Sequence, residues 1–337
     1  MQAPSSPRPL VIAHRGASGY RPEHTASAFL LAIDLGADAV EPDLVASRDG
    51  VLVIRHENEI STTTDVARHP EFADRRTTKT IDGVEVTGWF TEDFLWSELQ
   101  TLGASERMPR TRPANTTYDG VDGLLCLDDL LDLLQGAPTE TIVVVELKHP
   151  SYFAGIGLPL DVLLAEALRR RTALPRLIIE SFELSVLRQV AARGVQATLT
   201  YLIEAQGAPV DRPLAPYAAS LTDDGLAELA TVVDGISVDK AILLQTDDAG
   251  RTTVCDLVSR AHAVGLEVFC WTLRAENRFL AASHRRAGAA HARGDWQAEF
   301  AMLMAAGIDG VFADQPDLAV EARRRWWGAP GAVGGGV

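Results

Sequence analysis

Short apolar runs of β type alternate with amphipathic runs of helical type along almost the whole chain. The apolar runs are rich in Val, Ile and Leu, as parallel strands buried on both faces are; they end at His14, Leu44, Lys148, Phe182, Leu202, Asp239, Thr272 and Asp314. The amphipathic runs, several of which end in the glycine typical of a helix C-terminus, span residues 25–36, 127–134, 160–171, 184–194, 226–233, 252–265, 296–307 and 318–327.

Eight strands and eight helices in strict alternation predict an α/β fold, and specifically a (β/α)8 TIM barrel rather than a doubly wound sheet. The length of 337 residues suits one such barrel with an insertion. We therefore expect residues 1–337 to form a single TIM-barrel catalytic domain. The glycine-rich end, residues 328–337, has little to bury and is expected to be disordered.

A β-hairpin is the first departure from the alternation. Residues 51–56 are strand-like, but no helix precedes them, and Asp49-Gly50 is a signal for a two-residue hairpin turn. Continuing the antiparallel register from such a turn places Asp43 opposite His56. The hairpin is therefore predicted to fold His56 back over the mouth of the barrel.

A long insertion is the second departure. Residues 58–123 are polar, rich in threonine and contain proline, and they precede the helix of the second βα unit. This position predicts an insertion on the active-site face, at the C-terminal ends of the strands. A loop this long inside a compact domain is usually functional or forms a small subdomain.

The composition excludes some classes of partner. A hydrophobic content of 47% and a charged content of 23% are typical of a soluble globular protein. A formal net charge of −15 repels phosphate backbones, so we expect no nucleic-acid partner, although a local basic pocket could still hold a small phosphate ester. No apolar run reaches the ~20 residues of a membrane span. The first residues lack the apolar region of a signal peptide. We therefore expect either that the chain as encoded is cytoplasmic or that a leader is missing from this sequence, which leaves the compartment unknown, as is the oligomeric state.

Acidic residues at strand ends point to a divalent cation. Glu41 and Asp43 are two residues apart and so point to the same face of a strand, which in a barrel is the interior. Glu146 stands at the end of another strand. Carboxylates that face inward cost free energy unless a cation neutralises them, and oxygen ligands suit Ca²⁺ or Mg²⁺. The alternative is an internal ion-pair network with Arg15, Lys148 and Arg55.

Two histidines from different strands are predicted to converge on these carboxylates. His14 and His56 have the side chains whose pKa lies nearest neutral pH, which suits a general base and a general acid. Neither has a Cys or His partner at the spacing of a zinc site. The aromatic residues Phe182 and Trp271 also end strands; they are either core residues or the wall of an apolar or glycerol-like pocket.

The motifs that carry this chemistry resemble those of the glycerophosphodiester phosphodiesterase family. They are His-Arg-Gly-Ala from His14, Glu-Pro-Asp from Glu41, Arg-His-Glu-Asn from Arg55, Glu-Leu-Lys from Glu146, Cys-Trp-Thr from Cys270 and Asp-Gly-Val-Phe-Ala-Asp from Asp309. The resemblance covers nearly the whole chain. Within the family, the sequence is similar to the bacterial periplasmic or secreted branch. That branch usually begins with an export signal, which this sequence does not show.

The resemblance implies metal-dependent hydrolysis of glycerophosphodiesters to glycerol 3-phosphate and an alcohol, with Ca²⁺ or Mg²⁺ as the cofactor. In this sequence it assigns acid–base catalysis to His14 and His56, metal binding to Glu41, Asp43 and Glu146, and phosphate binding to Arg15 and Lys148. A lysophospholipase D or sphingomyelinase D-like enzyme on the same scaffold is the alternative, and it requires an apolar trough for an acyl chain. A retaining glycosidase would leave both histidines unexplained.

Overall fold

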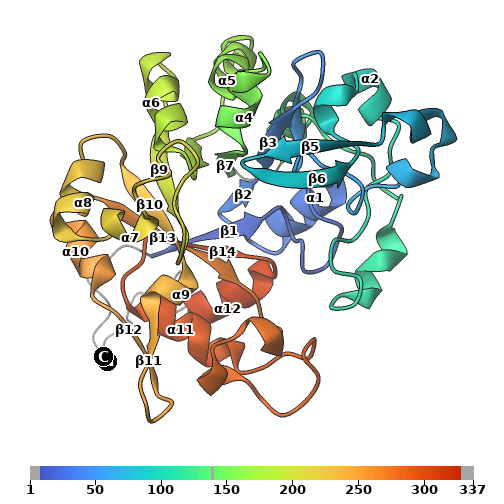
Figure 1. Ribbon diagram of the computed structural model, residues 1–337. Helices are drawn as coiled ribbons and strands as arrows, with labels where there is room; N and C mark the ends of the chain where they lie inside the picture. The colour runs from blue at the N-terminus through green and yellow to red at the C-terminus, as the bar shows by residue number, and fades with distance from the viewer. Residues whose placement is uncertain (1–7, 138–139, 328–337) are drawn as a thin grey trace.

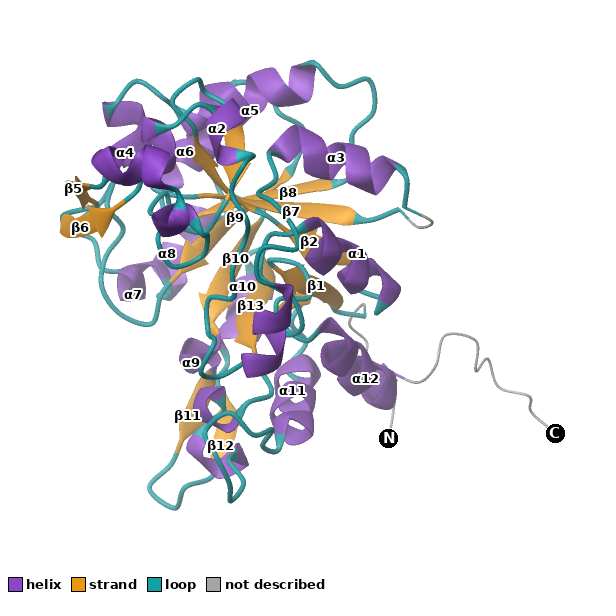
Figure 2. Cartoon of the chain, turned by 90° about the vertical axis from the view of Figure 1, so that its right-hand side faces the viewer, coloured by secondary structure: helices purple, strands orange, loops and turns teal. Residues whose placement is uncertain are grey.

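A closed parallel barrel forms the centre of the molecule (Figures 1 and 2). The computed structural model describes residues 8–137 and 140–327, so our prediction for residues 328–337 lies outside them. Within the described residues the eight barrel positions are occupied by β1 (Leu10–His14), β2 (Ala39–Glu41) continued by β3 (Asp43–Ala46), β7 (Ile142–Leu147), β8 (Leu177–Ser181), β9 (Thr198–Ile203), β10 (Gly235–Asp239), β13 (Glu267–Leu273) and β14 (Gly310–Ala313). Parallel pairing of β1 with β14 closes the barrel, which confirms the predicted fold class.

The helices that follow these strands surround the barrel (Figure 2). They are α1 (Ala26–Asp34), α3 (Leu127–Gln135), α5 (Leu160–Arg169), α6 (Leu184–Ala192), α8 (Asp223–Leu229), α10 (Leu257–Ala263), α11 (Trp296–Ala305) and α12 (Pro316–Trp327). The short helices α2 (Trp96–Leu99), α4 (Pro150–Gly155), α7 (Tyr217–Ser220) and α9 (Lys240–Leu243) lie in the connections.

One predicted helix begins later than expected. We predicted a helix over 252–265, but Thr252–Val254 forms strand β12, which pairs in antiparallel fashion with β11 (Leu244–Thr246). The helix α10 starts only at Leu257. The run Thr-Thr-Val is β-branched and favours an extended backbone, and the resulting hairpin projects away from the barrel (Figure 1).

The register of the first hairpin also differs from the prediction. Strand β4 (Leu52–Ile54) pairs with β3 through Leu44 and Ile54, and the Arg55 N–H donates to the Asp43 carbonyl. Asp43 therefore lies opposite Arg55, not opposite His56. The cause is a three-residue loop in which Gly50 adopts a φ of 78°, instead of the two-residue turn that we expected.

The inward positions of the barrel strands form two layers. The lower layer is apolar and consists of Ile12, Ala39, Val144, Ile178, Phe269 and Phe312. Because side chains alternate along a strand, the residue two positions later points inward at the next level. Those residues are His14, Glu41, Glu146, Glu180, Trp271 and Asp314. The alternation that fills the barrel core thus also places the polar layer above it.

The segment 58–123 lies between β4 and α3 and carries the hairpin of β5 (Thr77–Ile81) and β6 (Val84–Gly88) together with α2. Figure 1 shows these elements together at one side of the barrel.

Among the described residues, the helices are all too short or too polar to cross a membrane.

We expect Gly50→Ala to lower the free energy of unfolding by about 1–2 kcal/mol, because a residue with a Cβ is strained in the left-handed region. The control is Gly136→Ala at the end of α3, where φ is −84° and no strain arises. Chemical denaturation of both variants checks this; equal stability of the two would contradict the strained-loop explanation.

Candidate active site

The polar layer of the barrel brings three carboxyl groups together. Oxygen atoms of Glu41, Glu146 and Glu180 lie within 4.8 Å of one another, and all three residues are buried. The strands hold them in register, with His14 beside Glu41 and Glu146 beside Glu180. Glu180 is a candidate that our sequence analysis missed. The signal was present, because Glu180 ends an Ile-Ile-Glu run much as Glu146 ends a Val-Val-Glu run.

Electrostatics disfavour ionisation of this cluster. Burial, followed by repulsion from neighbouring carboxylates, raises the pKa of Glu41 and of Glu180 well above the usual value. Burial also raises the pKa of Glu146, to about 8, although the charge of Lys148 opposes this. The Oε2 atom of Glu180 is buried and has no hydrogen-bond partner among the described residues. A hard divalent cation fits such a set of carboxylate oxygens, because it would both ligate them and offset their charge.

Asp43 has a different environment from this cluster. Its Oδ2 atom lies 2.7 Å from His24 Nε2 and 3.3 Å from Arg15 Nε, and its Oδ1 atom lies 3.2 Å from Lys148 Nζ. Burial favours the neutral acid. The positive charge of Lys148, followed by the effect of the other basic neighbours, outweighs burial and holds the pKa of Asp43 well below its usual range. Asp43 is therefore held ionised by protein groups. Its role as a metal ligand stays a prediction.

The ion-pair network that we considered as an alternative is formed in part. Lys148 Nζ lies 2.6 Å from Glu146 Oε1, and Glu41 accepts a 2.7 Å hydrogen bond from the Arg15 backbone N–H. Arg55, however, donates to the carbonyls of Ile54, Thr63 and Glu23 and to none of these carboxylates. The protein cations therefore pair with Asp43 and Glu146, and among the described residues no cation forms an ion pair with Glu180.

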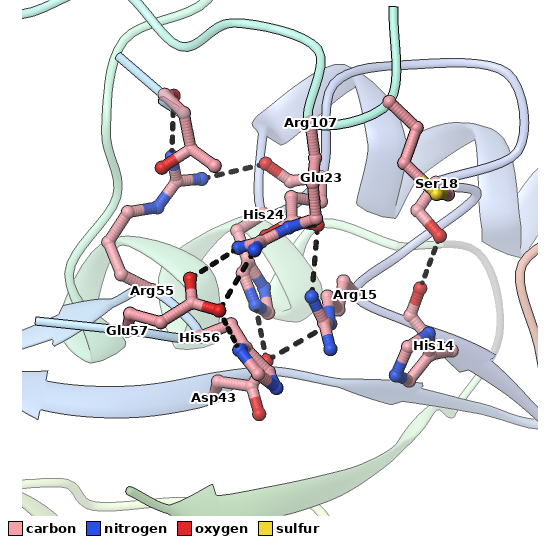
Figure 3. Close-up of polar contacts among 12 residues, drawn as sticks. His14, Arg15, Ser18, Glu23, His24, Asp43, Arg55, His56, Glu57 and Arg107 are labelled. Carbon is pink, nitrogen blue, oxygen red and sulfur yellow. Dashed lines mark hydrogen bonds and ion pairs between the residues drawn. The ribbon is translucent and has the colours of Figure 1, made fainter. Parts of the chain in front are cut away.

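Each predicted catalytic histidine is hydrogen-bonded through Nδ1 to a carboxylate. His14 Nδ1 lies 2.6 Å from Asp314 Oδ1. His56 Nδ1 lies 2.5 Å from Glu57 Oε1, and Figure 3 shows this contact. The pKa of Asp314 and the pKa of Glu57 both lie well below the usual range, because hydrogen bonds and nearby cations outweigh burial. Each carboxylate is therefore an ionised acceptor for an Nδ1–H donor. This leaves Nε2 as the atom of each ring that is available to exchange a proton.

Burial and the charge of Arg15 set the protonation state of both rings. They lower the pKa of His14 to about 4 and the pKa of His56 to about 3, despite the carboxylate partners. Both imidazoles are therefore neutral near pH 7 before a substrate binds.

A cavity of about 500 Å³ joins these groups. His14, His56, Glu41, Glu146 and Glu180 line it together with Arg15 and Lys148, and aromatic residues form part of its wall. The Phe182 ring packs edge-on against Trp271, at 5.8 Å between centroids, and lies 6.3 Å from the Tyr217 ring. Of the predicted site residues, all except Asp43 line this cavity, and Asp43 lies beside it in contact with Lys148.

Several polar residues of this region were not predicted from the sequence. Glu57, Asp314 and His24 had no assigned role, and His24 is fully buried against Asp43. Arg107 comes from the segment 58–123, where no hydrophobic periodicity indicated its position. His149, which also had no assigned role, lines the cavity beside Asp82.

Comparison with known proteins identifies the family of this chain. Residues 14–318 match the model of the glycerophosphoryl diester phosphodiesterase family. Glycerophosphodiester phosphodiesterase GDPD6 of Arabidopsis thaliana is 31% identical over 91% of this chain and 84% of its own length. The glycerophosphodiester phosphodiesterase of Bacillus subtilis is 26% identical over 93% and 86%.

A solved structure has the same fold. It is that of an Oleispira antarctica phosphodiesterase in complex with the product sn-glycerol-3-phosphate; it superposes with a TM-score of 0.61 at 22% identity, over 93% of this chain and 96% of that one. The family match spans nearly the whole barrel and includes the polar layer at its mouth. The chain therefore belongs to the glycerophosphoryl diester phosphodiesterase family.

Proposed function

We propose that this protein hydrolyses glycerophosphodiesters to sn-glycerol 3-phosphate and an alcohol, with His14 and His56 as proton carriers and one divalent cation, Ca²⁺ or Mg²⁺, as cofactor. The observation that carries the proposal is the pair of histidine–carboxylate hydrogen bonds at one cavity, beside buried acidic groups that lack sufficient protein cations. Family membership supports the reaction class. The product complex of the Oleispira protein is consistent with the same product here.

The anionic phosphate of the substrate is proposed to lie near Arg15 and Lys148, whose charged groups line the cavity. Both are already paired with Asp43, so their positions do not depend on the substrate. Such preorganised cations stabilise the charge that develops on the phosphoryl oxygens in the transition state.

Glu41 and Glu146 are proposed to hold the cation, with either Asp43, as predicted from the sequence, or Glu180, as the grouping of oxygen atoms favours. When bound, the cation would supply Lewis acidity at a phosphoryl oxygen and would help to orient the substrate. It would also neutralise carboxylates that otherwise repel one another.

The two histidines are proposed to transfer protons through Nε2. One takes the proton of the nucleophile, which is either water or the hydroxyl at the 2-position of the glycerol moiety, and the other protonates the departing alcohol oxygen. The low pKa of both rings provides the neutral form that the base requires. The acid must first gain a proton, which the negative charge of the bound phosphate favours because it offsets Arg15.

Binding of the cation is expected to release protons. Carboxyl groups with a raised pKa hold their protons at pH 7, and a cation must displace them. Because the pKa of Glu146 is about 8, affinity for Ca²⁺ or Mg²⁺ should increase as the pH rises from 6 to 8. Calorimetric titration of chelator-treated protein in two buffers with different heats of ionisation measures this release.

The same titration identifies the third ligand. Glu180→Gln and Asp43→Asn remove one carboxylate each. The variant that lacks a true ligand should lose more metal affinity than the roughly 10–100-fold that is typical of an outer-sphere residue. Glu98→Gln, in the insertion and paired with Arg75, is the control. Absence of a saturable site, or binding without proton release, would show that the cation proposal is wrong.

His14→Ala and His56→Ala are each expected to lower kcat by a factor on the order of 10²–10⁴, and the double variant should lose much less than the product of the two. A p-nitrophenol leaving group needs no protonation, so it should rescue only the variant that lacks the acid. His69→Ala is the control, because His69 is a partly exposed histidine of the insertion that lies outside the cavity. Steady-state kinetics on alkyl and aryl diesters measure this; rescue of both variants, or of neither, contradicts the two roles.

A substrate panel separates the proposal from the lysophospholipase D alternative. Diesters of glycerol phosphate with choline, ethanolamine or glycerol should have similar kcat/KM values. A diester whose glycerol moiety lacks a hydroxyl should lose much more kcat/KM, because a hydrogen-bonding group left without its partner in a buried site discriminates strongly. Faster turnover of lysophosphatidylcholine than of glycerophosphocholine would favour the alternative instead.

A further inference from the structure

The insertion supplies one arginine to each histidine–carboxylate pair. Arg107 and Arg112 both lie in the segment 58–123, five residues apart, yet they reach opposite pairs. Arg107 contacts Glu57, the partner of His56, and Arg112 contacts Asp314, the partner of His14. Neither arginine belongs to the barrel that carries the histidines.

Arg107 clamps two carboxylates at once. Its Nη1 and Nη2 atoms donate to Glu57 at 2.9 and 2.6 Å, and its Nε and Nη2 atoms donate to Glu23 at 2.7 and 2.6 Å. Figure 3 shows the guanidinium between the two carboxylates, with His56 on the far side of Glu57. Among the described residues, Arg107 is the arginine that pairs with Glu57, whose other partner is the neutral ring of His56.

Arg112 is more deeply buried, with 5% of its side chain exposed. Its Nη2 atom donates to Asp314 Oδ2 at 2.6 Å, while Nε donates to Glu276 at 2.8 Å and Nη1 to the Ser18 carbonyl at 3.1 Å. Asp314 Oδ2 also accepts from Arg274 Nε at 2.7 Å. The carboxylate that orients His14 therefore has two arginine partners, whereas Glu57 has one.

Such contacts determine where the histidine ring points. At Glu57, the planar guanidinium of Arg107 donates to both carboxylate oxygens and so fixes the plane of the carboxylate. At Asp314, Arg112 and Arg274 both donate to Oδ2 and hold that one oxygen in place. The carboxylate oxygen in turn fixes the Nδ1–H bond, and hence the direction of Nε2 on the other side of the ring. Without the arginine, the carboxylate can rotate toward water and the ring loses its orientation.

We propose that Arg107 and Arg112 are positioning residues for the two proton carriers, so that the insertion completes the active site of the barrel. This inference rests on the proposed function, because it assigns an orienting group to each histidine of that reaction. It also predicts unequal effects. Loss of Arg107 leaves Glu57 with no other arginine, whereas loss of Arg112 leaves Asp314 with Arg274.

The test compares each arginine variant with the variant of its own histidine. Arg107→Ala should lower kcat about 10–100-fold, which is the effect of losing an outer-sphere orienting group or of misplacing a reacting group by about 1 Å. Arg112→Ala should lower kcat less. A second readout is the ratio of kcat on aryl to kcat on alkyl glycerophosphodiesters. Arg107→Ala should change this ratio in the same direction as His56→Ala does, and Arg112→Ala in the same direction as His14→Ala does. The double variant Arg107→Ala/His56→Ala should be no slower than His56→Ala.

The matched control is Arg75→Ala. Arg75 also lies in the insertion, also donates to both oxygens of a glutamate, Glu98, at 2.8 and 2.6 Å, and has 27% of its side chain exposed against 24% for Arg107. Its contacts do not reach either histidine, so it should leave kcat and the aryl-to-alkyl ratio unchanged. Arg107→Lys should recover only part of the activity, because an ammonium group cannot make both paired contacts.

If Arg107→Ala does not fold, Glu57→Gln removes the same ion pair and should show the aryl-to-alkyl ratio of His56→Ala. The inference is overturned if Arg107→Ala or Glu57→Gln leaves kcat and the aryl-to-alkyl ratio unchanged, as Arg75→Ala does. It is also overturned if the two arginine variants have the same aryl-to-alkyl ratio while the two histidine variants have different ratios. Failure of the proposed function is distinct: in that case the histidine variants themselves retain full activity.

Discussion

More acidic side chains share one layer of the barrel interior than the surrounding protein cations can neutralise. Glu41, Glu146 and Glu180 face one another where water is largely excluded, and ionising all of them there without a counter-charge is unfavourable. The strand alternation makes the arrangement unavoidable, since the same inward positions hold the apolar core one level below. The divalent cation that we propose would resolve the conflict, and a phosphate diester is a substrate that such a centre could bind.

Protein groups compensate the charge of some acidic side chains in this region and not of others. Arg15, Lys148 and His24 converge on Asp43, so the basic residues are held where a phosphate can meet them. The histidines are arranged in a similar way, each with Nδ1 engaged by an ionised carboxylate and Nε2 left for the substrate. Positioning by fixed charges thus recurs throughout the site, and part of it comes from the insertion.

The sequence was sufficient for the barrel and for the residues at its strand ends, because both follow from a period of two within strands and from their alternation with helices. The hairpin register was wrong, since Gly50 allows a three-residue loop that the Asp-Gly pair alone does not reveal. Glu180 carried the same signal as Glu146 and was overlooked. Arg107 and Arg112 were beyond prediction, because irregular segments have no periodicity that ties their side chains to a distant strand.

The most direct test is a crystal structure of the protein with Mn²⁺ and sn-glycerol 3-phosphate. Anomalous scattering locates the ion independently of the coordinates. We predict one ion ligated by Glu41 and Glu146, with the phosphate beside it and within hydrogen-bond distance of Nε2 of His14 or of His56. An ion bound elsewhere, or a phosphate that contacts neither histidine, would contradict the account.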